Sequence, residues 1–124
     1  MTETVVMLDM TSEARANEIR PFLPPGMVFT HGTARGEEHM KEIIANADYA
    51  IAGQVAVSGD VMRAGKKLKL IQKWGVGVDN IDLKAARELG VKVARTTGSN
   101  AVPVAEFALG LALAALRGIA HGNA

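Results

Sequence analysis

Short apolar runs alternate with segments of helical character along most of this chain, and this alternation is the feature that most constrains its fold. The apolar runs recur about every 22 residues and cover residues 4–8, 27–30, 49–52, 68–74 and 91–94. Helices are expected between them, over residues 12–23, 37–47, 58–64 and 82–89. Strands that are apolar on both faces and joined by single helices form right-handed β–α–β crossovers. We therefore predict an α/β fold: a doubly wound parallel sheet of five strands with helices on both faces.

Size and composition exclude several classes of function. A chain of 124 residues is expected to form one domain, with 1–99 as its body and 100–124 as an appended helix and tail. Its 14 basic and 13 acidic residues are nearly balanced, so neither nucleic acid nor an anionic membrane is an expected partner. The sequence has no cysteine, which excludes disulfides, thiolate nucleophiles and cysteine-bound zinc, and a cytoplasmic location is the default expectation.

The last apolar segment differs from the others because it is apolar around nearly its whole circumference. It covers residues 101–116, too few for the roughly 20 residues of a membrane span, and contains Pro103 and Glu106. A helix of this kind has to be buried on all sides, yet a sheet covers only one of them. We expect it to meet another domain or another subunit, with burial in the core of this domain as the alternative.

The best candidate site is the stretch Gly75-Val76-Gly77-Val78-Asp79-Asn80, between an expected strand and an expected helix. Open parallel sheets bind ligands at the carboxyl ends of their strands. The two glycines would bring the amide groups of Val76 and Gly77 to the surface, which suits a small carboxylate. The dinucleotide fingerprint is absent, because Asn80 stands where its last glycine would be. The alternative is a tight turn without a ligand, in which Asp79 caps locally.

Asn100 has two interpretations. At the start of the last helix, with Pro103 in the first turn, it is suited to be an N-cap whose side chain binds free amide groups. Since the expected strand 91–94 would end beside the Gly75 loop, Ser99 and Asn100 could also edge the same cleft.

The sequence shows no catalytic constellation. His31, His39 and His121 are scattered, without a second ligand at helical spacing, so we predict no metal site. No serine, histidine and acid are arranged as a nucleophile with its base. Catalysis would need groups from elsewhere.

Two stretches resemble a known family. Residues 68–93, LKLIQKWGVGVDNIDLKAARELGVKV, and 99–117, SNAVPVAEFALGLALAALR, are similar to D-2-hydroxyacid dehydrogenases in sequence, order and separation. The resemblance implies a flavodoxin-like substrate domain, a separate Rossmann domain that binds NAD or NADP, and hydride transfer between the nicotinamide and a D-2-hydroxy acid or its 2-oxo partner. The family's catalytic arginine, glutamate and histidine match no position here, so the chain is expected to be a truncated, inactive half.

The resemblance also implies roles for particular residues. The amides of Val76 and Gly77 would hold the substrate carboxylate, and Gln54 and Val55 would line the substrate pocket. Asn100 would edge the substrate side of the cleft, with Val104 near the cofactor. The family's helix matching 101–117 contributes to a homodimer. Because the segment 53–57 is uncharged, a small unphosphorylated acid is favoured.

The rival hypothesis is a non-catalytic binding or interaction module of flavodoxin-like fold. A phosphoacceptor receiver would need clustered acids after the first strand, and flavodoxin itself a phosphate loop rich in Thr and Ser. Residues 9–13, DMTSE, fit neither pattern well.

Overall fold

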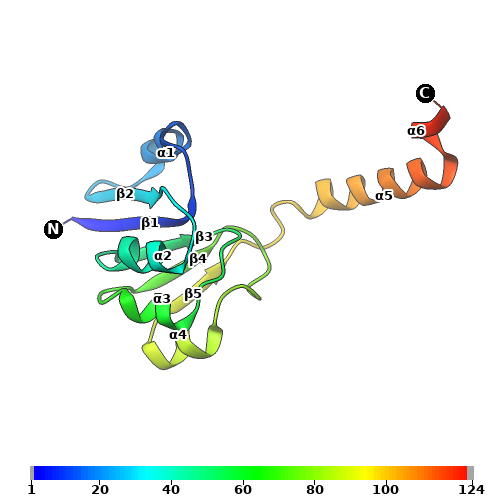
Figure 1. Cartoon of the computed structure of the whole chain (residues 1–124). Coiled ribbons are helices and arrows are strands. Elements are labelled where there is room, and N and C mark those ends of the chain that lie inside the picture. Colours follow the sequence, from blue (N-terminus) through cyan, green and yellow to red (C-terminus); the bar gives the residue numbers. More distant parts are fainter. Residues whose placement is uncertain (1, 123–124) are drawn as a thin grey trace.

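The computed structural model of the chain describes residues 2–122 and contains a five-stranded, all-parallel sheet (Figure 1). The strands are β1 (Glu3–Met10), β2 (Met27–Gly32), β3 (Tyr49–Ala52), β4 (Leu70–Lys73) and β5 (Lys92–Arg95). Their order is β2-β1-β3-β4-β5, the flavodoxin-like arrangement, so the predicted fold class is confirmed. Every expected strand is present, with small differences at its ends.

The helices follow the predicted segments closely. They are α1 (Glu13–Ile19), the 3₁₀ turn η1 (Arg20–Phe22), α2 (Glu37–Ile44), α3 (Gly59–Ala64), α4 (Leu83–Leu89), α5 (Ala101–Arg117) and α6 (Ile119–Gly122). The helix expected over 12–23 tightens into η1 at Pro21, whose ring cannot donate a helical hydrogen bond. The caps expected for α4 are confirmed: Asp82 accepts the N–H of Ala85, and Gly90 ends the helix with φ 71°.

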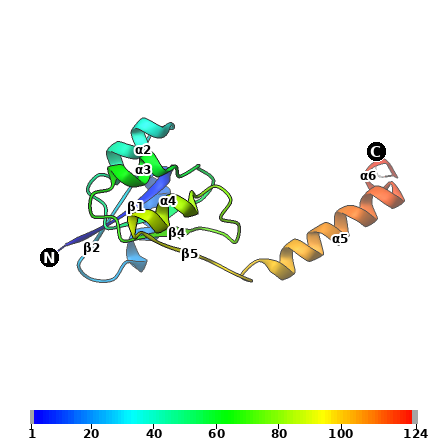
Figure 2. The same ribbon diagram turned by 90° about the horizontal axis from the view of Figure 1, so that it is seen from below.

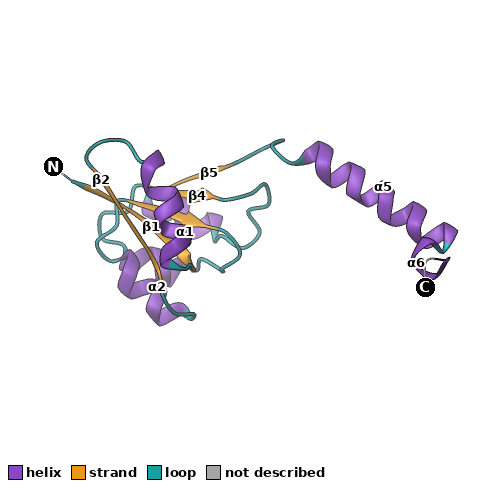
Figure 3. Ribbon diagram, turned by 90° about the horizontal axis from the view of Figure 1, so that it is seen from above, coloured by secondary structure: helices purple, strands orange, loops and turns teal. Residues whose placement is uncertain are grey.

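Two apolar clusters lie on opposite faces of the sheet because successive side chains of β1 alternate. Val6 and Leu8 pack with α2, α3 and α4, in the larger cluster. Val5 and Met7 pack with α1 in the smaller one. Figure 2 shows α2, α3 and α4 grouped together, and Figure 3 shows α1 in front of the strands in the view from above.

Helices lie on both faces of the sheet, as predicted, but the α1 face is only partly covered. Of the described helices, α1 alone packs on this face, against β1 and β2, and the clusters place no helix over its β4–β5 part. Trp74 and Phe22 are consequently exposed there.

Helix α5 extends away from the sheet (Figure 1). None of its residues is buried, so burial in the core of this domain, the alternative prediction, is wrong. Burial against another domain or subunit stays a prediction. None of the helices within residues 2–122 has the length and apolar character needed to cross a membrane.

Candidate functional site

The Gly75 loop follows β4 and is held by both neighbouring strands. The N–H of Trp74 donates to the carbonyl of Ala52 at 2.9 Å, and the N–H of Thr96 donates to that of Gly75 at 3.0 Å. The predicted proximity of the end of β5 to this loop is thereby confirmed. Gly75 has φ 144°, a conformation that favours glycine.

The amide groups of Val76 and Gly77 find no acceptor among residues 2–122. Both residues are exposed, so their N–H groups are open to a ligand from solvent. Successive backbone N–H groups in a turn can donate together to one anion. The geometry is therefore compatible with the predicted carboxylate site.

Two charged groups flank these amides. Arg95 lies on one side, where its Nη1 donates to the carbonyl of Val76 at 3.5 Å. Asp79 lies on the other, and a Cβ on Gly77 would come within 2.9 Å of its Oδ1. The carboxylate of Asp79 accepts no hydrogen bond within the described residues, so it does not cap the turn. Sequence reasoning missed Arg95, whose only signal is its place at the end of a strand.

The segment 53–57 is tied directly to the Gly75 loop. Val57 donates its N–H to the carbonyl of Asn80 at 2.8 Å and accepts the N–H of Asp82 at 3.0 Å. These bonds join the segment that carries Gln54 and Val55 to the far end of the Gly75 loop. Asn80, which sequence reasoning treated only as a missing glycine, also donates its Nδ2 to Val55. This use of the side chain explains why the loop departs from the dinucleotide fingerprint.

A cavity of about 320 Å³ opens on the other side of the segment 53–57, at the switch point between β1 and β3 where such folds bind ligands. Gln54 and Val55 contribute to it, whereas Val76 and Gly77 do not. Arg35 reaches it from the loop after β2, so the cavity has a cation that the uncharged segment 53–57 lacks. Its lining consists of Leu8, Asp9, Met10, Ala34, Arg35, Gly36, Met40, Gln54 and Val55.

Asn100 and Val104 lie apart from these loops. Asn100 occupies the N-cap position of α5, but its side chain makes no capping hydrogen bond, so that part of the prediction is wrong. Its φ of −124° and ψ of 13° differ from the extended geometry usual at an N-cap. No hydrogen bond within residues 2–122 joins Asn100 to the Gly75 loop. Val104 is exposed in the first turn of α5, which projects from the domain.

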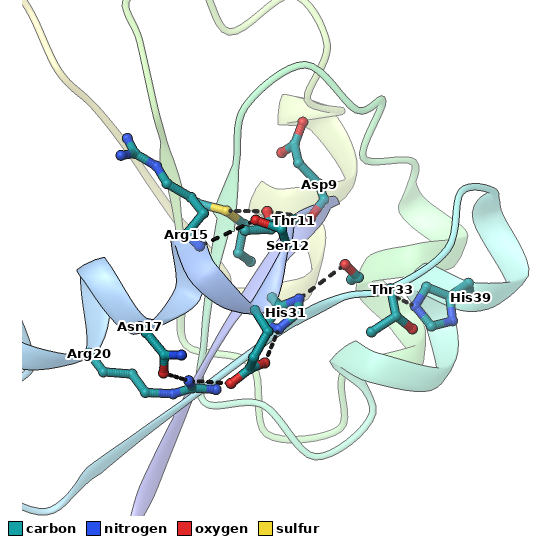
Figure 4. A network of polar contacts seen from close by, with 12 residues as sticks. Asp9, Thr11, Ser12, Arg15, Asn17, Arg20, His31, Thr33 and His39 are labelled. Atoms are coloured by element: carbon teal, nitrogen blue, oxygen red, sulfur yellow. Dashed lines mark hydrogen bonds and ion pairs between the residues drawn. The ribbon is translucent and has the colours of Figure 1, made fainter.

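Two histidines have structural partners (Figure 4). The Nε2 of His31 lies 3.0 Å from Oε2 of Glu13 and links β2 to α1, and the Nε2 of His39 accepts the N–H of Thr33 at 3.1 Å. Arg20 completes the first network by binding Glu13 at 2.5 Å. Within residues 2–122, no three acidic or histidine side chains gather as metal ligands would.

The largest displacements of pKa occur away from the Gly75 loop. The backbone N–H of Thr4, with Lys67 and Lys69, lowers the pKa of Asp48 to about 2. Arg20 and His31 lower the pKa of Glu13 to about 2, and Glu3 with Asp48 raises the pKa of Lys69 to about 12. These groups tie strand starts and α1 together, so their perturbation reflects structure and not catalysis.

Comparison with known proteins supplies the family. A sequence profile described as "D-isomer specific 2-hydroxyacid dehydrogenase, catalytic domain" matches residues 5–122. The chain belongs to this family. The resemblance inferred from residues 68–93 and 99–117 is thereby confirmed.

Individual relatives agree with this assignment. The chain is 42% identical over 88 residues to the hydroxypyruvate reductase of Thermotoga maritima, covering 70% of this chain and 29% of that protein. It is 41% identical over 87 residues to the D-3-phosphoglycerate dehydrogenase of Archaeoglobus fulgidus, covering 70% and 16% respectively. The NAD⁺-bound 3-phosphoglycerate dehydrogenase of Entamoeba histolytica matches 92% of this chain and 39% of its own, with TM-score 0.77 and 27% identity.

The chain thus spans well under half the length of these D-2-hydroxyacid dehydrogenase relatives.

Proposed function

We propose that this chain is the substrate-binding part of an NAD(P)-dependent D-2-hydroxyacid dehydrogenase, which interconverts a small D-2-hydroxy acid and its 2-oxo acid. The observation that carries the proposal is the pair of free amides at Val76 and Gly77, on the loop that matches the family motif. They would donate to the substrate carboxylate, with Arg95 supplying a nearby positive charge. Gln54 and Val55, on the segment that Val57 bonds to the Gly75 loop, would contact the remainder of the acid.

The cofactor would supply hydride transfer and would be bound mainly by residues outside this chain. The Gly75 loop does not fit a pyrophosphate, because Asn80 fills the place of the last glycine and its amide is already bonded to the carbonyl of Val55. The first turn of α5 is the part of this chain that we assign to the cofactor side of the cleft, with Val104 near the nicotinamide and Asn100 at the substrate. By itself the 124-residue chain should bind the acid and leave NADH unoxidised.

A titration of backbone amide resonances with oxalate, glyoxylate and then NADH tests this function. Oxalate should shift the signals of Val76 and Gly77, whereas NADH should leave them unchanged. Arg95→Gln should weaken oxalate binding several-fold, because a charge-assisted contact is lost. The matched control is Arg87→Gln, an exposed arginine on α4. Oxalate shifts confined to other parts of the chain would contradict the assignment.

We also propose that α5 forms a homodimer contact, and that the boundary between domain and helix lies at residues 99–100. Along α5 the exposed large apolar side chains are Val102, Val104, Phe107, Leu109, Leu111, Leu113 and Leu116. An apolar surface of this extent on a projecting helix is typical of a protein interface. Its match to the family's dimer-forming helix supports a second copy of the chain as the partner.

A further inference from the structure

The segment Gly53–Val55 has an unusual set of partners: side chains bind its backbone from both sides. The carboxylate of Asp9, at the end of β1, accepts the N–H of Gly53 at 2.5 Å, of Gln54 at 2.7 Å and of Val55 at 3.3 Å. Three successive amides therefore converge on one carboxylate. Figure 4 shows this side chain separate from the network of His31.

The carbonyl groups of the same segment point to the other side. Lys73 Nζ donates to the carbonyl of Gly53, and Asn80 Nδ2 donates to Gly53 at 3.2 Å and to Val55 at 2.6 Å. Lys73 Nζ also donates to Asn80 Oδ1 at 2.9 Å, which fixes the orientation of that amide. The peptide group between Gly53 and Gln54 thus lies between an anion and a cation. Its N–H, that of Gln54, points to Asp9, and its carbonyl, that of Gly53, accepts from Lys73.

Burial of the charged Lys73 side chain lowers the stability of the fold unless its hydrogen bonds to the loop compensate. The residue is 7% exposed, and no carboxylate lies within 4.0 Å of its Nζ in the described part of the chain. Burying a charge without an opposite partner is unfavourable, and an apolar side chain at the end of a buried strand would avoid that cost. The hydrogen bonds from Lys73 to Gly53 and Asn80 offset part of this cost and hold the loop.

Gly53 itself shows how closely the segment approaches Asp9. A Cβ at this position would lie 3.0 Å from Oδ2 and 3.1 Å from Oδ1 of Asp9. A Cβ at position 53 would therefore require the carboxylate or the backbone to shift by a few tenths of an ångström.

We propose that Asp9, Lys73 and Asn80 are positioning residues that fix the substrate-binding edge of the domain; this inference rests on the proposed function. Asp9 and Lys73 hold the segment that carries Gln54 and Val55. Asn80 joins that segment to the loop that carries Val76 and Gly77. Each of the three sets the relative placement of the groups that would bind the substrate.

The test uses the full chain, oxalate as probe and amide NMR as readout. Asp9→Asn replaces one carboxylate oxygen by an amide donor that faces N–H groups, and Lys73→Met removes the ammonium. Each should weaken oxalate binding about tenfold, because an unpaired polar group in the segment loosens it. Lys73→Arg should restore much of the affinity, since it keeps the charge and its donors.

Asp48→Asn is the matched control. Asp48 is a buried carboxylate that, like Asp9, accepts a backbone N–H, that of Thr4 at 2.9 Å, but it lies before β3, at the opposite edge of the sheet. The Asp48→Asn substitution should lower the free energy of unfolding and leave oxalate affinity unchanged. If Asp9→Asn and Lys73→Met bind oxalate like the parent chain, or if Asp48→Asn weakens binding equally, the positioning role is wrong while the proposed function stands.

Amide hydrogen exchange further separates the positioning role of these residues from the proposed function of the chain. The N–H groups of Gly53, Gln54 and Val55 should be protected in the parent chain and exposed to exchange in Asp9→Asn, whereas those of Val76 and Gly77 should exchange rapidly in both. Fast exchange at Gly53–Val55 in the parent chain would overturn the inference. Protection there, combined with no binding of oxalate to the parent chain, would overturn the proposed function and, with it, the substrate-positioning role.

Discussion

The buried carboxylate of Asp48 binds a backbone N–H group and two half-exposed lysines. It is 5% exposed, accepts the N–H of Thr4 at 2.9 Å, and lies 3.2 Å from Lys67 Nζ and 3.3 Å from Lys69 Nζ. A sequence reading would treat these lysines as a solvated run, because nothing local shows that an aspartate some twenty residues earlier lies beside them. The lowered pKa of Asp48 turns this contact into a dependence of stability on pH.

Acid should destabilise the fold partly through Asp48. Its pKa falls from 3.8 in the unfolded chain to about 2 in the folded one, so its contribution is full above pH 4 and is lost as the pH falls through 2. Asp48→Asn should be less stable than the parent chain above pH 4, and the difference should shrink toward pH 2. Urea unfolding followed by circular dichroism over this range measures it. Asp79→Asn, whose carboxylate accepts no hydrogen bond in residues 2–122, is the control; a difference independent of pH would contradict the role of Asp48.

At the scale of elements, the packing of α3 on α4 depends on a close approach of their backbones. Gly59 opens α3 and is buried, and a Cβ there would lie 2.9 Å from Cβ of Ala85 in α4. Real Cβ atoms do not approach so closely, so a side chain at 59 has to push the two helices apart.

Gly59→Ala should therefore lower the free energy of unfolding by about 1–3 kcal/mol, as overpacking does in well-packed cores. The double variant Gly59→Ala with Ala85→Gly should recover part of the loss, because it returns the space. Chemical denaturation of four chains, the parent, the two single variants and the double variant, measures the coupling. In Gly110→Ala the new Cβ meets open space, and alanine is the better helix former by about 1 kcal/mol, so α5 should become more helical. If Gly59→Ala leaves the free energy of unfolding unchanged, the two helices have room to adjust and the prediction is wrong.

At the scale of the whole molecule, the sheet domain and α5 differ in how they are stabilised. The domain has buried clusters on both faces of the sheet, whereas α5 exposes apolar side chains along its length and contributes no buried residue. The hydrophobic effect therefore favours association through α5.

The chain should sediment as a dimer at high protein concentration, and residues 1–99 alone should remain folded and monomeric. The double variant Leu109→Lys with Leu113→Lys, which places two charges on one side of α5, should also be monomeric. Analytical ultracentrifugation separates these cases, with circular dichroism to show that the sheet domain is intact. A parent chain that stays monomeric at every concentration would exclude the α5 contact.

The sequence by itself determined the fold class, all five strands, the caps of α4 and the extent of α5, because each depends on periodicity or on residues a few positions apart. The family and the Gly75 loop could also be predicted from the sequence, since each is marked by a continuous stretch of residues. Only the tertiary structure decided the rest. Asp9, Lys73 and Asn80 meet at Gly53 across three strands, Arg95 comes beside Val76 from a fourth, and Asn100 makes no capping bond despite its favourable position. Such contacts join residues up to 46 positions apart, as between Asp9 and Val55, and depend on strand order, which local patterns do not specify.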